Sequence, residues 1–110
     1  MDCLFCGIVS GALPSRKLYE DDKCLAFYDI SPKAPIHFLV IPKAHEIERA
    51  SGINAGNAAI VAHIFVVIAE IASKLGLQDG YRVVNNCGEC AGQTVAHLHF
   101  HVLSGCDLPW

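Results

Sequence analysis

The sequence predicts an α+β domain in which one long helix packs on a mostly antiparallel sheet of about five strands. Short apolar stretches rich in aromatic and β-branched residues alternate with turn-forming residues. One long helical pattern lies in the middle of the chain, and a short one lies near its amino terminus. A chain of 110 residues suffices for one core, so we expect a single domain over 1–110.

The amino-terminal part predicts a short helix followed by two strands. Residues 3–11 (CLFCGIVSG) place apolar side chains on one side of a helical turn. Gly11 is suited to end that helix, and Pro14 cannot continue it. Residues 17–22 and 24–30 then predict two short strands around an Asp-Asp-Lys turn.

The remaining strands lie on both sides of the long helix. The two prolines in 31–35 (SPKAP) indicate a loop, after which 36–41 (IHFLVI) predicts a strand that Pro42 stops. Residues 80–86 (GYRVVNN) predict a strand that runs into a loop, and 97–103 (HLHFHVL) predicts the last strand.

The long helix is predicted over 51–76, with Ser51 or Asn54 as its N-cap and Gly76 at its C-cap. Its segment 58–69 (AAIVAHIFVVIA) is apolar on nearly every side, so more than one face must be covered. A chain of this size has little else to cover that surface, and we therefore predict a homodimer. The alternative is that the sheet covers one face and the rest is small alanine surface.

Composition and charge exclude several classes of protein. The formal net charge is −3, so the chain lacks the excess of Lys and Arg with which general nucleic-acid binders neutralise phosphates. The first residues do not resemble a secretory signal, and 58–69 is too short to span a membrane and contains His63. We therefore expect a cytoplasmic protein without nucleic-acid or membrane partners, whose six cysteines are not a disulfide framework.

Three of the six histidines lie within five residues near the carboxyl end. His97, His99 and His101 alternate with apolar residues, so on a strand they share one face at spacings of about 6.6 Å. A row of imidazoles on a rigid strand is suited to bind a metal or to supply a nucleophile with helpers. The alternative is a polar strand face whose outward residues are histidine without a function.

The same residues carry a resemblance that extends over essentially the whole chain. The run HLHFHVL resembles the motif of the histidine triad (HIT) family of nucleotide hydrolases and transferases. Residues 26–45 (AFYDISPKAPIHFLVIPKAH) and 85–105 (NNCGECAGQTVAHLHFHVLSG) resemble the Hint branch of that family, as does the ending DLPW. The resemblance implies the HIT fold and places Trp110 in a segment that approaches the partner's active site.

The resemblance implies that His99 is the catalytic nucleophile. It would attack the α-phosphorus of a purine nucleoside phosphoramidate, release an amine and leave a nucleotidyl-histidine, which water would hydrolyse to the nucleoside monophosphate. Imidazole is largely neutral at pH 7, so its lone pair is available without strong activation. His101 is similar to the third histidine of the family, which donates to phosphate oxygens.

Further phosphate contacts are expected from the loop before the last strand. Gly92 allows a close approach of the backbone, and Gln93 and Thr94 add hydrogen-bond donors. Taken alone these residues are equally an ordinary loop, and it is the resemblance that implies phosphate binding. It also implies that Asn86 contacts the phosphate on the leaving-group side.

The nucleoside contacts are implied by the resemblance as well. Asp29 resembles the residue that accepts hydrogen bonds from the ribose hydroxyls, and a carboxylate accepts well from two neighbouring hydroxyls. By itself Asp29 is equally a turn residue. Phe5, Ile8 and Ile30 are similar to the residues that line the base pocket, although as apolar residues they are also suited to the core.

Two Cys-x-x-Cys pairs have the spacing that lets two thiolates reach one Zn²⁺. Cys6 and Cys87 are too far apart for a compact four-cysteine ribbon, in which about 15–20 residues separate the pairs. The motifs CLFC and IPKAH resemble zinc-binding bacterial members of the Hint branch. That resemblance implies one structural Zn²⁺ bound by four ligands, namely Cys3, Cys6, His45 and His97.

The alternative for the first pair is two buried thiols without a metal, and the second pair, Cys87 and Cys90, has no assigned role. Cys24 and Cys106 are interpreted as packing residues, and His37 and His63 as histidines with satisfied hydrogen bonds.

Other functions remain open at this level. One is a dinucleoside polyphosphate hydrolase or nucleotidyl transferase of the same family. Another is a zinc-stabilised dimeric adaptor without catalysis. A third is a catalytic metal that is bound by all three histidines of the run.

Overall fold

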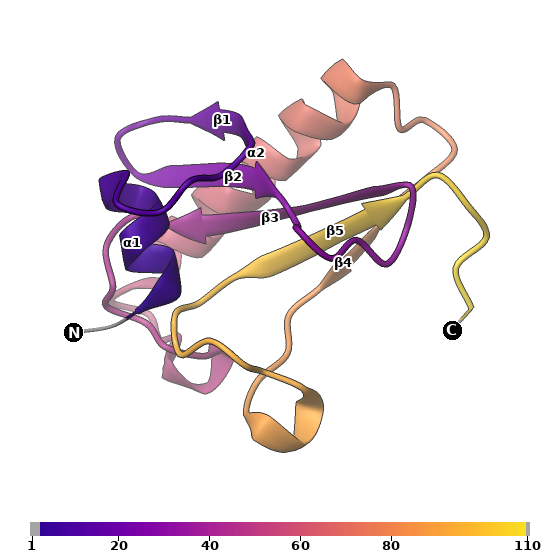
Figure 1. Ribbon diagram of the computed structural model, residues 1–110. Coiled ribbons are helices and arrows are strands. Elements are labelled where there is room, and N and C mark those ends of the chain that lie inside the picture. The colour runs from indigo at the N-terminus through magenta and orange to yellow at the C-terminus, as the bar shows by residue number, and fades with distance from the viewer. Residues whose placement is uncertain (1–2, 110) are drawn as a thin grey trace.

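The computed structural model describes residues 3–109, so Trp110 lies outside the described part of the chain. Five strands form one sheet, and Figure 1 shows the two α-helices on opposite faces of it. In chain order the elements are α1 (Leu4–Ser10), β1 (Lys17–Glu20), β2 (Cys24–Tyr28), β3 (Ile36–Pro42), α2 (Ala58–Leu75), β4 (Arg82–Val84) and β5 (Phe100–Ser104), with 3-10 turns at Ala50–Gly52 and Glu89–Ala91. The predicted α+β class is confirmed.

The strands pair in the order β1-β2-β3-β5-β4, and every pair is antiparallel. β3 is the central strand, and its Leu39 lies opposite Phe27 of β2 on one side and His101 of β5 on the other. This register brings the carboxyl-terminal histidines beside the strands that precede the long helix.

The two faces of the sheet carry separate apolar clusters. Because successive strand residues point to opposite faces, neighbours in β2 belong to different clusters. Cys24 and Ala26 pack in the cluster that includes α2, whereas Leu25 and Phe27 pack with Phe5 of α1. The thinner α1 face is the one on which the functional side chains are found.

α1 begins and ends as the sequence predicts. Cys3 occupies the N-cap position, where its sulfur accepts a hydrogen bond from the N–H of Cys6 (3.4 Å). Gly11 adopts the left-handed conformation (φ +85°) that ends many helices and that is costly for residues with a Cβ. Phe5 and Ile8 form the buried side of this helix.

α2 begins at Ala58, several residues later than predicted, and neither Ser51 nor Asn54 caps it. The amide side chains in this segment bond to nearby backbone instead. Asn54 Oδ1 accepts from the N–H of Gly56 (2.8 Å), and Asn57 Oδ1 accepts from the N–H of Asn54 (2.8 Å). Such local bonds compete with helix formation, which explains the late start.

α2 is also the most apolar element of the chain. It has 18 residues with a mean hydropathy of 1.9, so its length and composition alone would allow it to cross a membrane, contrary to the argument from 58–69. In this fold it is a core helix that packs on the sheet through a buried stripe of Ile64, Val67, Ile68, Ile71 and Ala72. Gly76 ends it in the left-handed conformation, as predicted.

The turn between β1 and β2 is held by the side chain of Asp21. One carboxylate oxygen accepts from the N–H groups of Lys23 and Cys24 (2.8 Å each). The other lies 2.7 Å from Nε2 of His63 and accepts from the hydroxyl of Tyr19 (2.8 Å). His63 therefore has a hydrogen-bond partner, which agrees with its interpretation as a satisfied histidine.

Candidate active site and metal centre

The run 97–103 keeps its alternation, although the strand is shorter than predicted. β5 begins at Phe100, so the first two histidines lie ahead of it and only the third lies within it. The N–H of Leu98 donates to the carbonyl of Ile47 (2.9 Å), which is not part of a strand. The residues between the histidines still pack in the cluster that includes α2, namely Leu98, Phe100 and Val102.

His99 and His101 line a cavity of about 580 Å³, a volume typical of small-molecule sites. Its walls come from α1, from β2 and the loop after it, and from the loop before β5. The cavity also includes most of the residues predicted to contact a nucleotide, namely Phe5, Ile8, Asp29, Ile30, Asn86, Gly92 and Thr94. Segments that are distant in sequence therefore meet around the two histidines.

His99 presents an unprotonated nitrogen to this cavity. Its Nδ1 donates to the backbone carbonyl of His97 (2.7 Å), so Nδ1 carries the proton and Nε2 keeps its lone pair. The ring is buried and lies edge-on to the ring of Phe5, with centroids 4.9 Å apart. Burial lowers the pKa of His99 below its ordinary value, so the ring is neutral at pH 7.

His101 lies beside His99, with ring centroids 5.1 Å apart. Burial, together with the neighbouring imidazoles of His99 and His37, lowers the pKa of His101 to about 4. The carboxylate of Asp29 is close to His101 and to the neighbouring His37, since Oδ2 lies 3.5 Å from Nε2 of His37 and 4.0 Å from Nδ1 of His101. Its Oδ1 accepts from the N–H of Ser31 (2.7 Å), which orients the carboxylate at the cavity wall.

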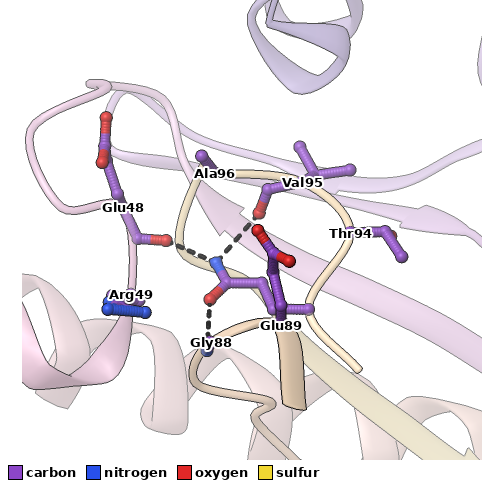
Figure 2. A pocket seen from close by; sticks show the side chains of 8 residues that line it. Glu48, Arg49, Gly88, Glu89, Thr94, Val95 and Ala96 are labelled. Carbon is purple, nitrogen blue, oxygen red and sulfur yellow. Dashed lines mark hydrogen bonds between the residues drawn. The ribbon is translucent and has the colours of Figure 1, made fainter. Parts of the chain in front are cut away.

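The predicted phosphate residues separate into two groups. Asn86, Gly92 and Thr94 line the cavity, whereas Gln93 lies on a neighbouring open cavity of about 680 Å³. Thr94 also borders this second cavity, which is shown in Figure 2. The amide of Gln93 is fully used by backbone groups there. Its oxygen accepts from the N–H of Gly88 (2.8 Å), and its nitrogen donates to the carbonyls of Glu48 (2.6 Å) and Val95 (2.9 Å). In this structure Gln93 holds the loop together.

The predicted base-pocket residues also differ in their surroundings. Phe5 and Ile8 are buried and pack with Phe27 and Leu39 in the α1 cluster. Ile30 is 95% exposed and stands at the rim of the cavity. A large apolar side chain that is left in water at the edge of a cavity is suited to cover a planar ligand.

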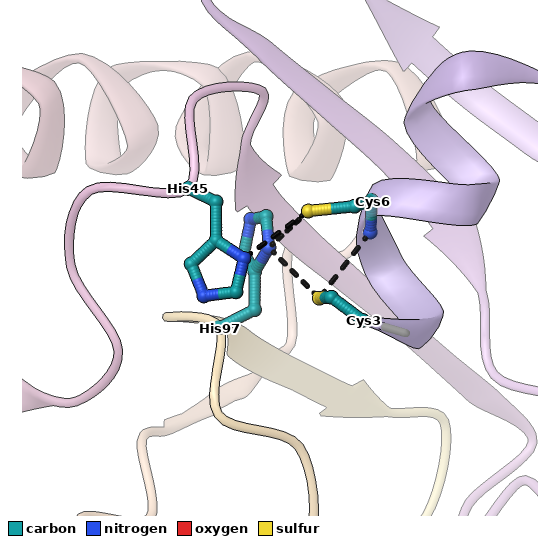
Figure 3. A group of neighbouring side chains, drawn as sticks. All are labelled: Cys3, Cys6, His45 and His97. Carbon is teal, nitrogen blue, oxygen red and sulfur yellow. Dashed lines mark hydrogen bonds between the residues drawn. The ribbon is translucent and has the colours of Figure 1, made fainter. Parts of the chain in front are cut away.

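A second cluster of side chains lies next to the cavity, where α1 meets the segment before β5. Figure 3 shows Cys3 and Cys6 facing His45 and His97. Their possible ligand atoms all lie within 4.8 Å of one another. Cys6 Sγ is 3.1 Å from Nδ1 of His45 and 3.7 Å from Nδ1 of His97, and Cys3 Sγ is 3.4 Å from the latter. Sulfur and nitrogen ligands of a tetrahedral Zn²⁺ are about 3.6 Å apart, so this set fits the ion.

Both histidines of this cluster are oriented by backbone carbonyls. Nε2 of His97 donates to the carbonyl of Pro42 (2.8 Å), and Nε2 of His45 donates to the carbonyl of Ala96 (2.7 Å). Each ring therefore carries its proton on Nε2 and turns the lone pair of Nδ1 toward the sulfurs. This is the arrangement by which backbone groups hold metal-binding histidines in proteins.

The alternatives for the cysteines are not favoured. Within residues 3–109, neither Cys87 nor Cys90 belongs to a group of three or more potential ligands close enough to share a metal. Hydrogen bonds from the backbone and hydroxyl of Ser51 lower the pKa of the Cys87 thiol. Cys24 is buried, as expected of a packing residue, but Cys106 is exposed, so that interpretation is wrong for Cys106.

A single metal held by all three histidines of the run is also not favoured. His97 lies in the cysteine cluster, and in the described residues no group of ligands contains it together with His99 and His101. The run is thus divided between two neighbouring sites.

Some residues in or beside the cavity were not predicted to belong to the site. His37, which the sequence indicated only as a histidine with satisfied hydrogen bonds, lies 2.9 Å from His101. Lys33 places a cation on the cavity wall, and nothing in the proline-rich loop indicated this. Tyr28 and Phe27 at the end of β2 complete the wall beside α1.

Comparisons with known proteins agree with this geometry. A family model described as the HIT domain matches residues 10–108. The structure superposes on a histidine triad protein from Clostridium difficile with a TM-score of 0.95 at 52% identity, covering 99% of this chain and 95% of that one. For a HIT family hydrolase from Clostridium thermocellum the TM-score is 0.94 at 46% identity, with coverages of 98% and 94%.

More distant and curated relatives agree. A histidine triad nucleotide-binding protein from Candida albicans has a TM-score of 0.84 at 34% identity, with 99% of this chain and 82% of that chain covered. A HIT-like protein from Synechococcus elongatus is 44% identical over 109 residues, which is 99% of this chain and 95% of that protein. The chain therefore belongs to the HIT domain family.

Proposed function

We propose that this protein is a nucleotide hydrolase of the Hint-like branch, which cleaves the P–N bond of purine nucleoside phosphoramidates. The observation that carries the proposal is the orientation of His99, whose Nδ1 is used by a carbonyl so that Nε2 keeps its lone pair, in a cavity that Asn86, Thr94 and Asp29 also line. Relatives described as a hydrolase and as a nucleotide-binding protein support the same class.

The chemistry follows from the residues around His99. Its Nε2 attacks the α-phosphorus, the P–N bond to the leaving amine breaks, and the amine nitrogen takes up a proton from solvent as it departs. The new P–N bond to His99 makes a nucleotidyl-histidine, which divides one difficult displacement into two easier ones. Asn86, Thr94 and the backbone at Gly92 line the same cavity and supply donors for the phosphate oxygens. Water then releases the nucleoside monophosphate and restores the histidine.

The nucleoside would lie on the α1 side of the cavity. Asp29 would accept hydrogen bonds from the ribose hydroxyls; its Oδ2 lies 4.0 Å from Nδ1 of His101, which lines the cavity, and its Oδ1 accepts from the N–H of Ser31. The buried ring of Phe5 and the exposed Ile30 offer two apolar surfaces for a purine. We place the whole function in one domain, residues 1–110, and in the cytoplasm.

The first prediction concerns turnover of an adenosine phosphoramidate that carries a fluorescent amine. His99→Ala should lower kcat/KM at least about a thousandfold, because the group that forms the covalent bond is lost. His63→Asn is the matched control, since His63 bonds Asp21 and neither residue lines the cavity, and it should retain turnover. Release of the fluorescent amine measures both.

Other outcomes would select other functions. Turnover of dinucleoside polyphosphates without turnover of the phosphoramidate would indicate the related hydrolase or transferase activity. Absence of turnover for every nucleotide substrate, with nucleotide binding retained, would indicate the adaptor. Either result would contradict the phosphoramidase.

We further propose that Cys3, Cys6, His45 and His97 bind a structural Zn²⁺. The two Nδ1 lone pairs and two thiols form a four-ligand set, and such closed sites stabilise a fold without taking part in catalysis. When bound, the ion would supply a cross-link between α1 and the segment that precedes β5. In the absence of a cation, burial and the neighbouring Cys3 raise the pKa of the Cys6 thiol.

The second prediction is that protein purified without chelator contains about one zinc per chain. Cys6→Ser should lose the metal and several kcal/mol of unfolding free energy, whereas Cys106→Ser, at an exposed cysteine, should change neither. Metal analysis and thermal unfolding provide the measurements. A zinc content far below one per chain in the unaltered protein would refute the site.

We also propose that the chain forms a homodimer. α2 buries only one stripe, and it leaves Phe65 46% and Val66 56% exposed. β4, at one edge of the sheet, pairs only with β5 among the described strands. An exposed apolar helix face and an edge strand are both features of surfaces that a second copy can cover.

The third prediction is that light scattering reports a dimer, and that Val66→Glu converts it to a monomer because a buried, unpaired carboxylate is costly. Leu13→Glu, which places the same charge on an exposed leucine of another segment, is the control and should remain dimeric. A monomeric unaltered protein would exclude the dimer.

The fourth prediction concerns stability and pH. The pKa of His101 is lowered to about 4, whereas an unfolded histidine titrates near 6.5. Between these values only the unfolded chain binds the extra proton, so the free energy of unfolding falls as the pH is lowered through this window. We expect this residue to contribute a loss of roughly 3 kcal/mol. Denaturant unfolding of the unaltered protein and of His101→Asn, at pH 7 and near pH 4, isolates that contribution; equal losses in both would contradict it.

A further inference from the structure

His37 occupies a position between a backbone amide and the cavity. It lies in β3, is 5% exposed, and has a hydrogen-bonding partner at each ring nitrogen. On one side is the backbone N–H of Lys33, and on the other is Nδ1 of His101. The proposed reaction does not require His37 to touch the substrate, so its contacts need a separate explanation.

The contact with Lys33 determines where His37 carries its proton. The backbone N–H of Lys33 donates to Nδ1 of His37 at 3.0 Å. A backbone amide can only donate, so Nδ1 must accept and cannot be protonated. The ring is then neutral, which agrees with the lowering of the pKa of His37 by burial, and its single proton is on Nε2.

The contact with His101 means that the tautomer of His37 also determines the tautomer of His101. Nε2 of His37 lies 2.9 Å from Nδ1 of His101, closer than the 3.5 Å to Oδ2 of Asp29. Two N–H groups cannot face each other at 2.9 Å, so Nδ1 of His101 must accept the hydrogen bond. The proton of His101 is therefore on Nε2, which is the nitrogen left to face the cavity that His101 lines.

We propose that His37 is a positioning residue. Because the Lys33 amide leaves the proton of His37 on Nε2, His37 donates to Nδ1 of His101, and His101 is then a hydrogen-bond donor toward the phosphate through its Nε2. The neighbouring ring has the opposite tautomer, because the carbonyl of His97 places the proton of His99 on Nδ1. One ring thus offers a lone pair and the next offers an N–H. The tautomers follow from geometry alone, and only their use in catalysis rests on the proposed function.

The tautomer of His101 is directly measurable by NMR in protein labelled with nitrogen-15 at histidine. Long-range nitrogen–proton correlations at neutral pH distinguish an Nδ1–H from an Nε2–H ring, and the signals of His101 are assigned by their loss in His101→Asn. We expect the unaltered protein to show only the Nε2–H form. Any other form of His101 as the main species would overturn the inference, whether or not the protein is active.

Two pairs of variants test the cause of this tautomer. Lys33→Pro removes the backbone N–H that Nδ1 of His37 accepts, whereas Lys33→Ala keeps it and removes only the side chain. We expect a mixture of His101 tautomers in the first and the Nε2–H form alone in the second. His37→Leu should also give a mixture, while His37→Gln, whose amide both accepts and donates, should restore the Nε2–H form. Unmixed Nε2–H in both Lys33→Pro and His37→Leu would show that His37 does not set the tautomer.

Kinetics connect the tautomer to the reaction. With the adenosine phosphoramidate, His37→Leu should lower kcat roughly 10- to 100-fold, since a donor to the phosphate is misdirected in part of the molecules. The KM should change much less, and His37→Gln should recover part of the lost kcat. If His37→Leu is too unstable to assay, the kcat of Lys33→Pro is compared with that of Lys33→Ala, because both lack the cation on the cavity wall and they differ in the backbone N–H. An unaltered protein that shows the Nε2–H tautomer but no turnover would refute the proposed function and leave the tautomer inference standing.

Discussion

The alternation of side chains along 97–102 is the constraint on which the rest of the structure depends. Leu98, Phe100 and Val102 are driven into the cluster that includes α2 because burial removes their apolar surface from water. Since consecutive residues point to opposite sides, the intervening histidines must face α1. The hydrophobic effect on one side of the chain thus places three imidazoles on the other, where the thin α1 layer leaves room for a ligand.

Backbone groups then determine what each imidazole can do. Four histidines, at positions 37, 45, 97 and 99, each bond a backbone amide or carbonyl. Backbone amides and carbonyls do not titrate in the physiological range, so the direction of each ring is set by the fold alone. Similar side chains can therefore serve as metal ligands, as a nucleophile and as a donor within a few ångströms of one another.

The architecture was predictable from the sequence because the spacing of apolar residues and the positions of helix-ending glycines indicate the same elements. Apolar stretches, Gly11 and Gly76 mark the elements, and the structure confirms the helix ends at these glycines. The start of α2 was not predictable, since the asparagines before it are suited both to cap a helix and to bond local backbone. Only the surrounding fold decides between these two uses of the same side chain.

The hydrogen-bond partners of individual site residues were harder to predict from the sequence than the presence of the site. The histidine run is recognisable in the sequence as a motif. The role of His37, in contrast, depends on β3 lying beside β5, which is determined by strand order and register. Likewise Gln93 has the composition of a phosphate ligand, and its three backbone bonds become visible only when the loop is folded. Local sequence reports which groups are available, whereas long-range pairing decides their partners.

The two sites are coupled through the chain segment that they share. His97 turns its ring toward the cysteines of α1 and its carbonyl toward His99, so one residue serves both. α1 in turn carries Phe5, whose ring packs edge-on against both His97 and His99. The proposed cross-link between the cysteines and His97 would therefore hold Phe5, the ring of His99 and its orienting carbonyl in one rigid unit. On this argument the proposed metal would act on the proposed reaction only through position, by limiting how far α1 can move from His99.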